Sequence, residues 1–256
     1  MSKALVLALL LLPITLFADD DLKSIEWMTE VFPPYNFYDA DNTLQGISVE
    51  IVEALFNTLG IQKSRRDIIV YPWARGYQMV QKPGLKNILF ATTRSKEREE
   101  KFKWFGPIGI IENNNISIFG KSDSPLIERH NLKNFRFSSV RSDVSNQMLL
   151  KHGVPKDNLM LASSISQVID LLMAPNRVDF AAYERGGFLH TVVADGKYEV
   201  SQFKEVATLE VGEAWFAVNK SIDESVVKKL QRALDKVKKD PALKTTLKNK
   251  FMFDMN

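Results

Sequence analysis

The sequence has 256 residues, with 34 Lys and Arg against 31 Asp and Glu, a formal net charge of +3. This near balance gives no basis for expecting a nucleic-acid or anionic-lipid partner. The chain contains no cysteine, which excludes disulfides, thiol chemistry, cysteine-ligated zinc and iron–sulfur clusters, so its stability must come from the core.

The first eighteen residues have the layout of a secretory signal peptide. Lys3 supplies the positive start, residues 4–12 are apolar, and Ala18 precedes three aspartates. The apolar run is shorter than the roughly 20 residues that span a bilayer, which argues against the alternative of a membrane anchor. We predict cleavage after Ala18 and export to the periplasm of a Gram-negative bacterium.

A first series of alternating strands and helices follows. Its clearest member is a helix at 47–59, because Ile51, Val52, Leu55 and Phe56 share one helical face and Gly60 ends it. The predicted elements are strand 24–30, a Pro-Pro loop at 32–35, helix 47–59, strand 67–71, helix 73–81 and strand 87–92.

A second series has the same alternation. Its predicted elements are strand 135–140, helix 143–152, strand 158–161, a helix that Ser163 or Ser164 caps and that reaches 173, strand 178–183 and helix 184–193. Such alternation is typical of α/β domains in which helices flank largely parallel sheets.

The two series are separated by segments that we expect to cross between two lobes, near residues 112–118 and 207–214. Two crossings return the chain to its first lobe, where helices at 223–239 and 241–251 would pack, the latter with Asp240 as its N-cap and Pro241 at its first position. The predicted domains are a signal peptide at 1–18, lobe 1 at 19–113 plus 214–256, and lobe 2 at 114–213.

Six short motifs are spread along the mature chain, at residues 32–37, 46–52, 71–75, 93–99, 105–107 and 177–184. In their order and spacing they resemble the family 3 extracellular solute-binding proteins, the amino-acid-binding components of bacterial ABC importers. The resemblance implies a two-lobed periplasmic-binding-protein fold of type II, with mostly parallel sheets flanked by helices and a two-strand hinge. It also implies a monomer that binds a small ligand and needs no cofactor.

The residues of segment 93–98 indicate a site that binds a carboxylate, independently of the family resemblance. It follows strand 87–92 and therefore reaches the carboxyl end of a sheet, where open α/β folds bind their ligands. The Thr93 hydroxyl and the Arg98 guanidinium are the donors that a carboxylate needs. The resemblance implies that Arg98 grips the α-carboxylate of the ligand and that Thr93 assists. A solvated charged turn is the alternative, and we prefer it for Arg94.

Glu184 is the candidate counterpart, since it ends strand 178–183. The resemblance implies that it receives the α-ammonium of an amino acid, whereas the alternative is an ordinary helix-start glutamate favoured by the helix dipole. With Arg98 on one lobe and Glu184 on the other, a zwitterion would bridge the cleft. The closed state would then gain contacts that the open state lacks.

Aromatic residues and a second turn complete the predicted site. Phe32 and Tyr35 flank the Pro-Pro turn and Trp73 lies at the mouth of the same sheet, so a ligand side chain could stack on them, although a core role is the alternative. The turn after strand 135–140 departs from the family pattern. Ser142 stands where glycine is expected, yet it could cap the next helix, and Arg141 could add a second cation.

The sequence therefore predicts a periplasmic protein that captures an amino acid or a related zwitterion and delivers it to an ABC permease. A sensory module for a membrane receptor would need the same two-lobed ligand site and stays open as an alternative. A dehydratase-like enzyme on this fold is a weaker alternative, because Glu184 alone is a candidate general acid. No metal-ligand spacing, phosphate loop or nucleophile motif is present.

Overall fold

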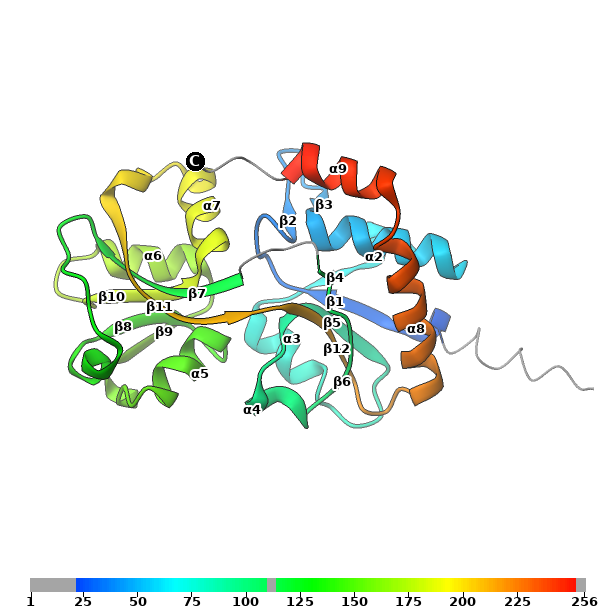
Figure 1. Ribbon diagram of the computed structural model, residues 1–256, viewed down its shortest axis with the longest axis horizontal. Helices are drawn as coiled ribbons and strands as arrows, with labels where there is room; N and C mark the ends of the chain where they lie inside the picture. The colour runs from blue at the N-terminus through cyan, green and yellow to red at the C-terminus, as the bar shows by residue number, and fades with distance from the viewer. Residues whose placement is uncertain (1–21, 110–113, 252–256) are drawn as a thin grey trace, which may run out of the picture.

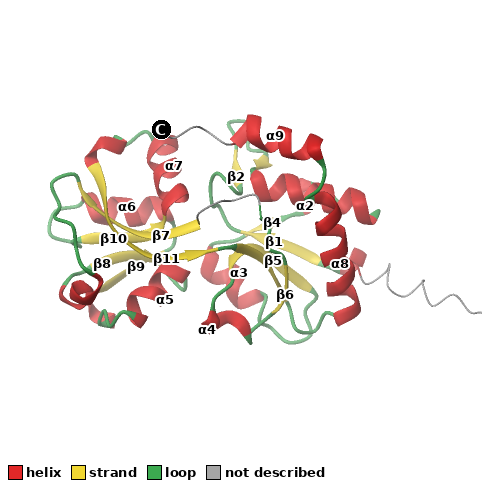
Figure 2. Cartoon of the chain, viewed as in Figure 1, coloured by secondary structure: helices red, strands yellow, loops and turns green. Residues whose placement is uncertain are grey.

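The computed structural model describes residues 22–109 and 114–251, which form two lobes lying side by side (Figure 1). Each lobe has a central β-sheet with helices packed against it (Figure 2). The predicted signal peptide at 1–18 and positions 112–113 of the first predicted crossing lie outside the described residues. No helix in the described ranges is both long and apolar enough to cross a membrane.

The sheet of lobe 1 is built from β1 (Glu26–Thr29), β4 (Ile69–Val70), β5 (Asn87–Thr93), β6 (Lys103–Phe105) and β12 (Ala214–Val218). Their order across the sheet is β4-β1-β5-β12-β6. β1 runs parallel to β4 and β5, whereas β12 lies antiparallel between β5 and β6. A separate small hairpin pairs β2 (Phe37–Tyr38) with β3 (Leu44–Gln45).

The sheet of lobe 2 is built from β7 (Asn114–Lys121), β8 (Phe137–Val140), β9 (Leu159–Ala162), β10 (Phe180–Glu184) and β11 (Phe203–Gly212). Their order is β11-β7-β10-β8-β9. β8 runs parallel to β9 and β10, and β7 is antiparallel to both β10 and β11. The paired strands β7 and β11 reach toward lobe 1 (Figure 1).

The sheets are mostly parallel, as predicted. In lobe 1, β4, β1, β5 and β6 point one way and only β12 opposes them; in lobe 2, β9, β8, β10 and β11 point one way and only β7 opposes them. The direction of each strand relative to the cleft between the lobes explains the two exceptions. β5 and β10 end at the cleft, whereas β7 and β12 begin there, where Ala214 pairs with Thr93 and Ile116 pairs with Glu184. Strands that leave the cleft must run antiparallel to strands that arrive at it.

The helices are α2 (Ile47–Leu59), α3 (Trp73–Met79), α4 (Lys96–Glu99), α8 (Glu224–Val237) and α9 (Pro241–Phe251) in lobe 1, and α5 (Val144–Lys151), α6 (Ile165–Met173) and α7 (Arg185–Asp195) in lobe 2. α2 has the predicted bounds, because its apolar face is buried and Gly60 closes it in the left-handed conformation. The side chain of Ser164 caps α6 and that of Asp223 caps α8.

The described residues also form short 3₁₀ helices: η1 (Arg65–Asp67), η2 (Arg129–Asn134), η3 (Lys156–Asn158) and η4 (Val200–Gln202). Two of them, η1 and η3, take the first residues of predicted strands. The strand predicted at 67–71 shrinks to β4 because η1 takes its first residue. Ser64 accepts a hydrogen bond from the backbone N–H of Arg66, and the Asp67 carboxylate accepts one from the backbone N–H of Ser64. This reciprocal capping stabilises a helical turn that periodicity does not reveal.

Aromatic rings pack against one another at the centre of each lobe. In lobe 1, Trp27 meets Phe56 and Phe216 edge-on, with ring centroids 5.2 and 6.2 Å apart. In lobe 2, Phe119 stacks on Phe188 at 3.9 Å. These side chains are almost wholly excluded from solvent. Because burial of a large aromatic ring contributes a few kcal/mol, each lobe has an independent source of stability.

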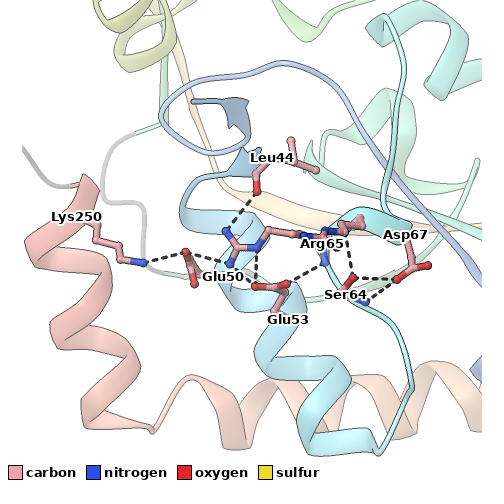
Figure 3. A network of polar contacts seen from close by, with 8 residues as sticks. Leu44, Glu50, Glu53, Ser64, Arg65, Asp67 and Lys250 are labelled. Carbon is pink, nitrogen blue, oxygen red and sulfur yellow. Dashed lines mark hydrogen bonds and ion pairs between the residues drawn. The ribbon is translucent and has the colours of Figure 1, made fainter. Parts of the chain in front are cut away.

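A polar network on the surface of lobe 1 joins α2, η1 and α9 (Figure 3). Arg65 donates to both carboxylate-bearing neighbours on α2, at 2.9 Å from Nε to Glu53 and within 3.4 Å of Glu50, and its Nη1 donates to the carbonyl of Leu44. Lys250 of α9 approaches Glu50 at 3.4 Å. Solvent-accessible pairs of this kind contribute little each to stability.

Gly46 holds the loop that carries Phe32 and Tyr35. Its φ of +124° is accessible to glycine alone, and a Cβ there would lie 2.4 Å from the Tyr35 carbonyl oxygen. We expect Gly46→Ala to lower the free energy of unfolding by about 3 kcal/mol, measured by urea denaturation. Gly60→Ala is the matched control, because its φ is also positive but a Cβ would meet nothing within 4 Å. It should cost about 1 kcal/mol, and equal losses would contradict the steric explanation.

Candidate functional site

The carboxyl ends of four strands from the two lobes meet at the cleft. Glu30 follows β1, Thr93 ends β5, Asp143 follows β8 and Glu184 ends β10. β1 and β5 are parallel in lobe 1, and β8 and β10 are parallel in lobe 2, so each pair of strands delivers its polar residues to one edge. This is the position where open α/β sheets bind ligands.

A small cavity lies between the lobes at these strand ends. Its free volume is about 10 Å³, which is on the scale of a single water molecule. Residues of both lobes line it: Glu30, Phe32, Trp73, Ala91, Thr93, Arg98, Ile116, Asp143, Val144, Tyr183 and Glu184. The combination of three carboxylates, one guanidinium and six aromatic or aliphatic side chains can bind a small molecule that carries charges.

Arg98 lies on the short helix α4 and is completely buried. Its Nη1 donates to the Thr93 carbonyl at 3.1 Å and its Nη2 to the Ser142 carbonyl at 3.2 Å. The guanidinium carbon lies 5.1 Å from the ring centres of both Trp73 and Tyr77. Burial lowers the pKa of Arg98, an effect opposed by nearby negative charge, first that of Asp143. Its buried Nε has no hydrogen-bond partner within the protein, so the group retains donor capacity toward the cavity.

Glu184 faces the same cavity from lobe 2 and is 4% exposed. Its carboxylate caps α7 by accepting from the backbone N–H groups of Gly186 and Gly187, and the Tyr35 hydroxyl donates to it across the cleft at 3.4 Å. Burial raises the pKa of Glu184 to about 7, although these hydrogen bonds pull in the opposite direction. The helix-start role and the cavity-lining position are therefore both present in one side chain.

Two further carboxylates line the cavity that the sequence reasoning did not select. Burial, together with the charge of Asp143, raises the pKa of Glu30 well above its usual range. Asp143 caps α5 by accepting from the backbone N–H of Ser145 at 2.9 Å, so the expectation that Ser142 caps this helix was wrong. Asp143 stands at the N-cap position with an extended backbone, whereas Ser142 lies one residue earlier with a positive φ. Asp143 lies in the turn after a predicted strand, and this position was the signal that could have revealed it.

Polar contacts join the lobes across the cavity. The Ser142 carbonyl accepts from the indole Nε1 of Trp73 at 2.9 Å as well as from Arg98, and both donors belong to lobe 1. Ser142 has a φ of +61°, which turns its carbonyl in this direction. Phe32 and Tyr183 also meet edge-on across the cleft, with ring centroids 5.8 Å apart.

The structure brings most of the predicted site residues together. Those that line the cavity are Phe32, Trp73, Thr93, Arg98 and Glu184; Tyr35 touches Glu184 and Ser142 touches Trp73 and Arg98. Arg141 is exposed and does not line the cavity. Arg94 forms an ion pair with Glu99 and lies over the Trp215 ring at 4.4 Å, away from the cavity. No set of three or more His, Cys, Asp or Glu among the described residues is placed to hold a metal ion.

A comparison with known protein families identifies the family of this chain. The sequence matches the bacterial extracellular solute-binding proteins, family 3, over residues 27–253. The chain belongs to this family. A comparison with curated protein sequences gave no significant match.

Solved structures support the two-lobed fold of this family 3 protein. An ancestral arginine-binding protein bound to arginine has a TM-score of 0.72 at 20% identity, covering 90% of this chain and 99% of the other. A histidine kinase sensor domain with similarity to periplasmic binding proteins has a TM-score of 0.73 at 17% identity, with 89% and 96% covered. The GluR0 ligand-binding core from Nostoc punctiforme, in complex with L-glutamate, has a TM-score of 0.71 at 16% identity, with 89% and 98% covered. At these identities the likeness concerns the fold alone.

The raised pKa of Glu184 predicts a pH dependence of stability. Between about pH 4.5 and 7 the folded protein keeps a proton on this carboxyl that the unfolded chain has lost, so stability falls as pH rises through this window. Glu184→Gln removes this contribution. The stability of the variant relative to the wild type, from urea unfolding at several pH values, should therefore increase by about 3 kcal/mol between pH 4.5 and 8.

Glu30 titrates in both proteins and cancels in this comparison. Glu128→Gln is the control, because Glu128 is an exposed carboxylate beside His130. If the curves of the wild type and Glu184→Gln stay parallel over the whole pH range, Glu184 is not a desolvated carboxyl.

Proposed function

We propose that this family 3 protein captures a zwitterionic α-amino acid between its lobes. The observation that carries the proposal is the placement of Arg98 on lobe 1 and Glu184 on lobe 2 against one cavity. A guanidinium binds a carboxylate through two parallel hydrogen bonds, and a buried carboxylate binds an ammonium group. The α-carboxylate would bind Arg98 and Thr93, and the α-ammonium would bind Glu184. Phe32 and Trp73 would form the walls.

Capture requires the lobes to separate and close. Typical ligand pockets have volumes of roughly 300–1,000 Å³, far above the space that the closed cleft leaves free. Admission of a ligand would therefore break the contacts of Ser142 with Trp73 and Arg98, and closure would remake them around it. We propose that lobe 1 comprises residues 19–113 plus 214–256, that lobe 2 comprises 114–213, and that the hinge lies near 112–118 and 207–214.

The destination of the ligand follows from the family by analogy. Export by the predicted signal peptide would place the protein in the periplasm, where it would deliver its amino acid to an ABC permease as a monomer. The likeness to a histidine kinase sensor domain supports the second candidate, a ligand-sensing module for a membrane receptor. Both functions would use the same two-lobed ligand site, and an adjacent permease gene would favour transport.

A thermal-shift screen tests the proposal directly. Amino acids should raise the melting temperature of the purified protein, whereas organic acids without an ammonium group should not, because a ligand that binds only the folded state stabilises it. Arg98→Ala should weaken amino-acid binding by about 100-fold, the effect of losing a charge-assisted bidentate contact. Arg94→Ala is the matched control from the same segment and should bind as the wild type does.

Circular dichroism would verify that each variant is folded, and Arg98→Lys keeps the charge if Arg98→Ala does not fold. Because lysine cannot reproduce the planar fork, Arg98→Lys should also bind more weakly. An amino-acid shift that survives both substitutions would show that Arg98 is not the carboxylate site.

The indole of Trp73 offers a test of closure. Trp73→Phe keeps an aromatic side chain but removes the Nε1 donor to the Ser142 carbonyl. The free energy of association between the lobes should fall by about 1 kcal/mol. We expect an increase in the open population, seen as a larger radius of gyration in X-ray scattering without ligand. Trp104→Phe is the control, because its Nε1 donates to Glu99 within lobe 1. Equal scattering from the two variants would contradict a role of Trp73 in holding the lobes together.

A further inference from the structure

We infer that the amino acid bound in this cleft carries a second cationic group on its side chain. The inference rests on the proposed function and specifies its ligand class. The observation behind it is the charge of the cavity wall: Glu30, Asp143 and Glu184 face one buried cation, Arg98. With all four groups ionised the wall has an excess of two negative charges, which a net-neutral zwitterion leaves in place.

The excess is not offset by other cations of the cavity wall. The positive charge that acts on Glu30 is that of Arg98, which is also the group that faces Asp143. Arg185 acts on Glu184, but its guanidinium is 44% exposed and forms an ion pair with Glu205 at 3.1 Å. One buried guanidinium therefore serves two carboxylates and has an unpartnered Nε as well.

The energetic consequence favours a cationic ligand. Burial destabilises the ionised form of a carboxyl, and the pKa values of Glu30 and Glu184 are raised for this reason, in Glu184 despite its hydrogen bonds. An ammonium or guanidinium group placed beside them would restore the ionised forms, since an opposite charge within a few ångströms favours ionisation. A cation bound in the cavity would therefore take the place of the protons that burial otherwise favours on these two carboxyls.

The arrangement of the three carboxylates separates two cation positions. Glu184, on the α7 side of lobe 2, would receive the α-ammonium as proposed above. Glu30 of lobe 1 and Asp143 of lobe 2 influence each other and approach Arg98, so they form a second acidic pair across the cleft. The buried Tyr183 lines the same cavity, and the charges of all three carboxylates act on it. The side-chain cation would lie at the Glu30–Asp143 pair, against the aromatic wall that includes Trp73.

Calorimetric titration of the purified protein at pH 8 tests this inference with matched ligands. Arginine is compared with citrulline, which has the same length but a neutral ureido group, and lysine is compared with norleucine. We expect the preferred cationic member to bind at least 100-fold more tightly than its neutral counterpart. Glu30→Gln should reduce this preference at least tenfold, because it removes one of the two carboxylates that would hold the side-chain cation. Glu128→Gln, which alters an exposed carboxylate, should keep the preference.

The outcomes separate the inference from the proposed function. If a neutral amino acid binds as tightly as its cationic counterpart, the inference is wrong while the proposed function stands. If no amino acid of any charge binds, the proposed function fails. If putrescine, which has two amines and no carboxylate, binds as tightly as the amino acids and is insensitive to Arg98→Ala, the assigned role of Arg98 is overturned. The ligand comparison uses the unaltered protein and stays decisive even if Glu30→Gln fails to fold.

Discussion

The buried guanidinium of Arg98 is the constraint on which the cleft depends. A cation without water must be surrounded by carbonyl oxygens, aromatic faces and negative charges, and these come from both lobes: Thr93, Trp73 and Tyr77 from one, Ser142 and Asp143 from the other. The relative position of the lobes therefore decides how well Arg98 is solvated by protein. In the proposed function a ligand carboxylate would compete for the same donors, which would couple occupancy of the cavity to the separation of the lobes.

Strand direction explains why these groups converge. Each lobe places the carboxyl ends of its parallel strands at the cleft, where Glu30, Thr93 and Glu184 lie. The antiparallel strands β7 and β12 begin at the same edge, and β7 contributes Ile116 to the wall. The apolar side chains beside the charges come from both lobes, among them Trp73 at the start of α3 and Val144 at the start of α5, so the cavity is amphipathic.

Sequence reasoning was most successful where local signals agree. The bounds of α2 were predicted because an apolar face and a terminal glycine specify the same helix, and Arg98, Thr93 and Glu184 were selected because each follows or ends a recognisable strand. Glu30 was missed because it was counted within the first strand, so its position beyond the last paired residue was not visible. The capping of α5 by Asp143 rather than Ser142 depends on a positive φ at Ser142, which no residue pattern reveals. Contacts across the cleft depend on how the two lobes meet. The residue pattern within one lobe does not specify this arrangement.

The charges of the cleft also determine what can close it. Glu30 and Asp143 come from opposite lobes, so closure brings two like charges together in a poorly solvated space and is opposed by their repulsion. A ligand shifts the balance between open and closed lobes only by the difference in its affinity for the two states. In the proposed function a zwitterion would gain its contacts with Arg98 and Glu184 on closure but would leave this repulsion in place. A side-chain cation between the two carboxylates would convert the repulsion into attraction, so the charge of the ligand and the closure of the lobes would be parts of one equilibrium.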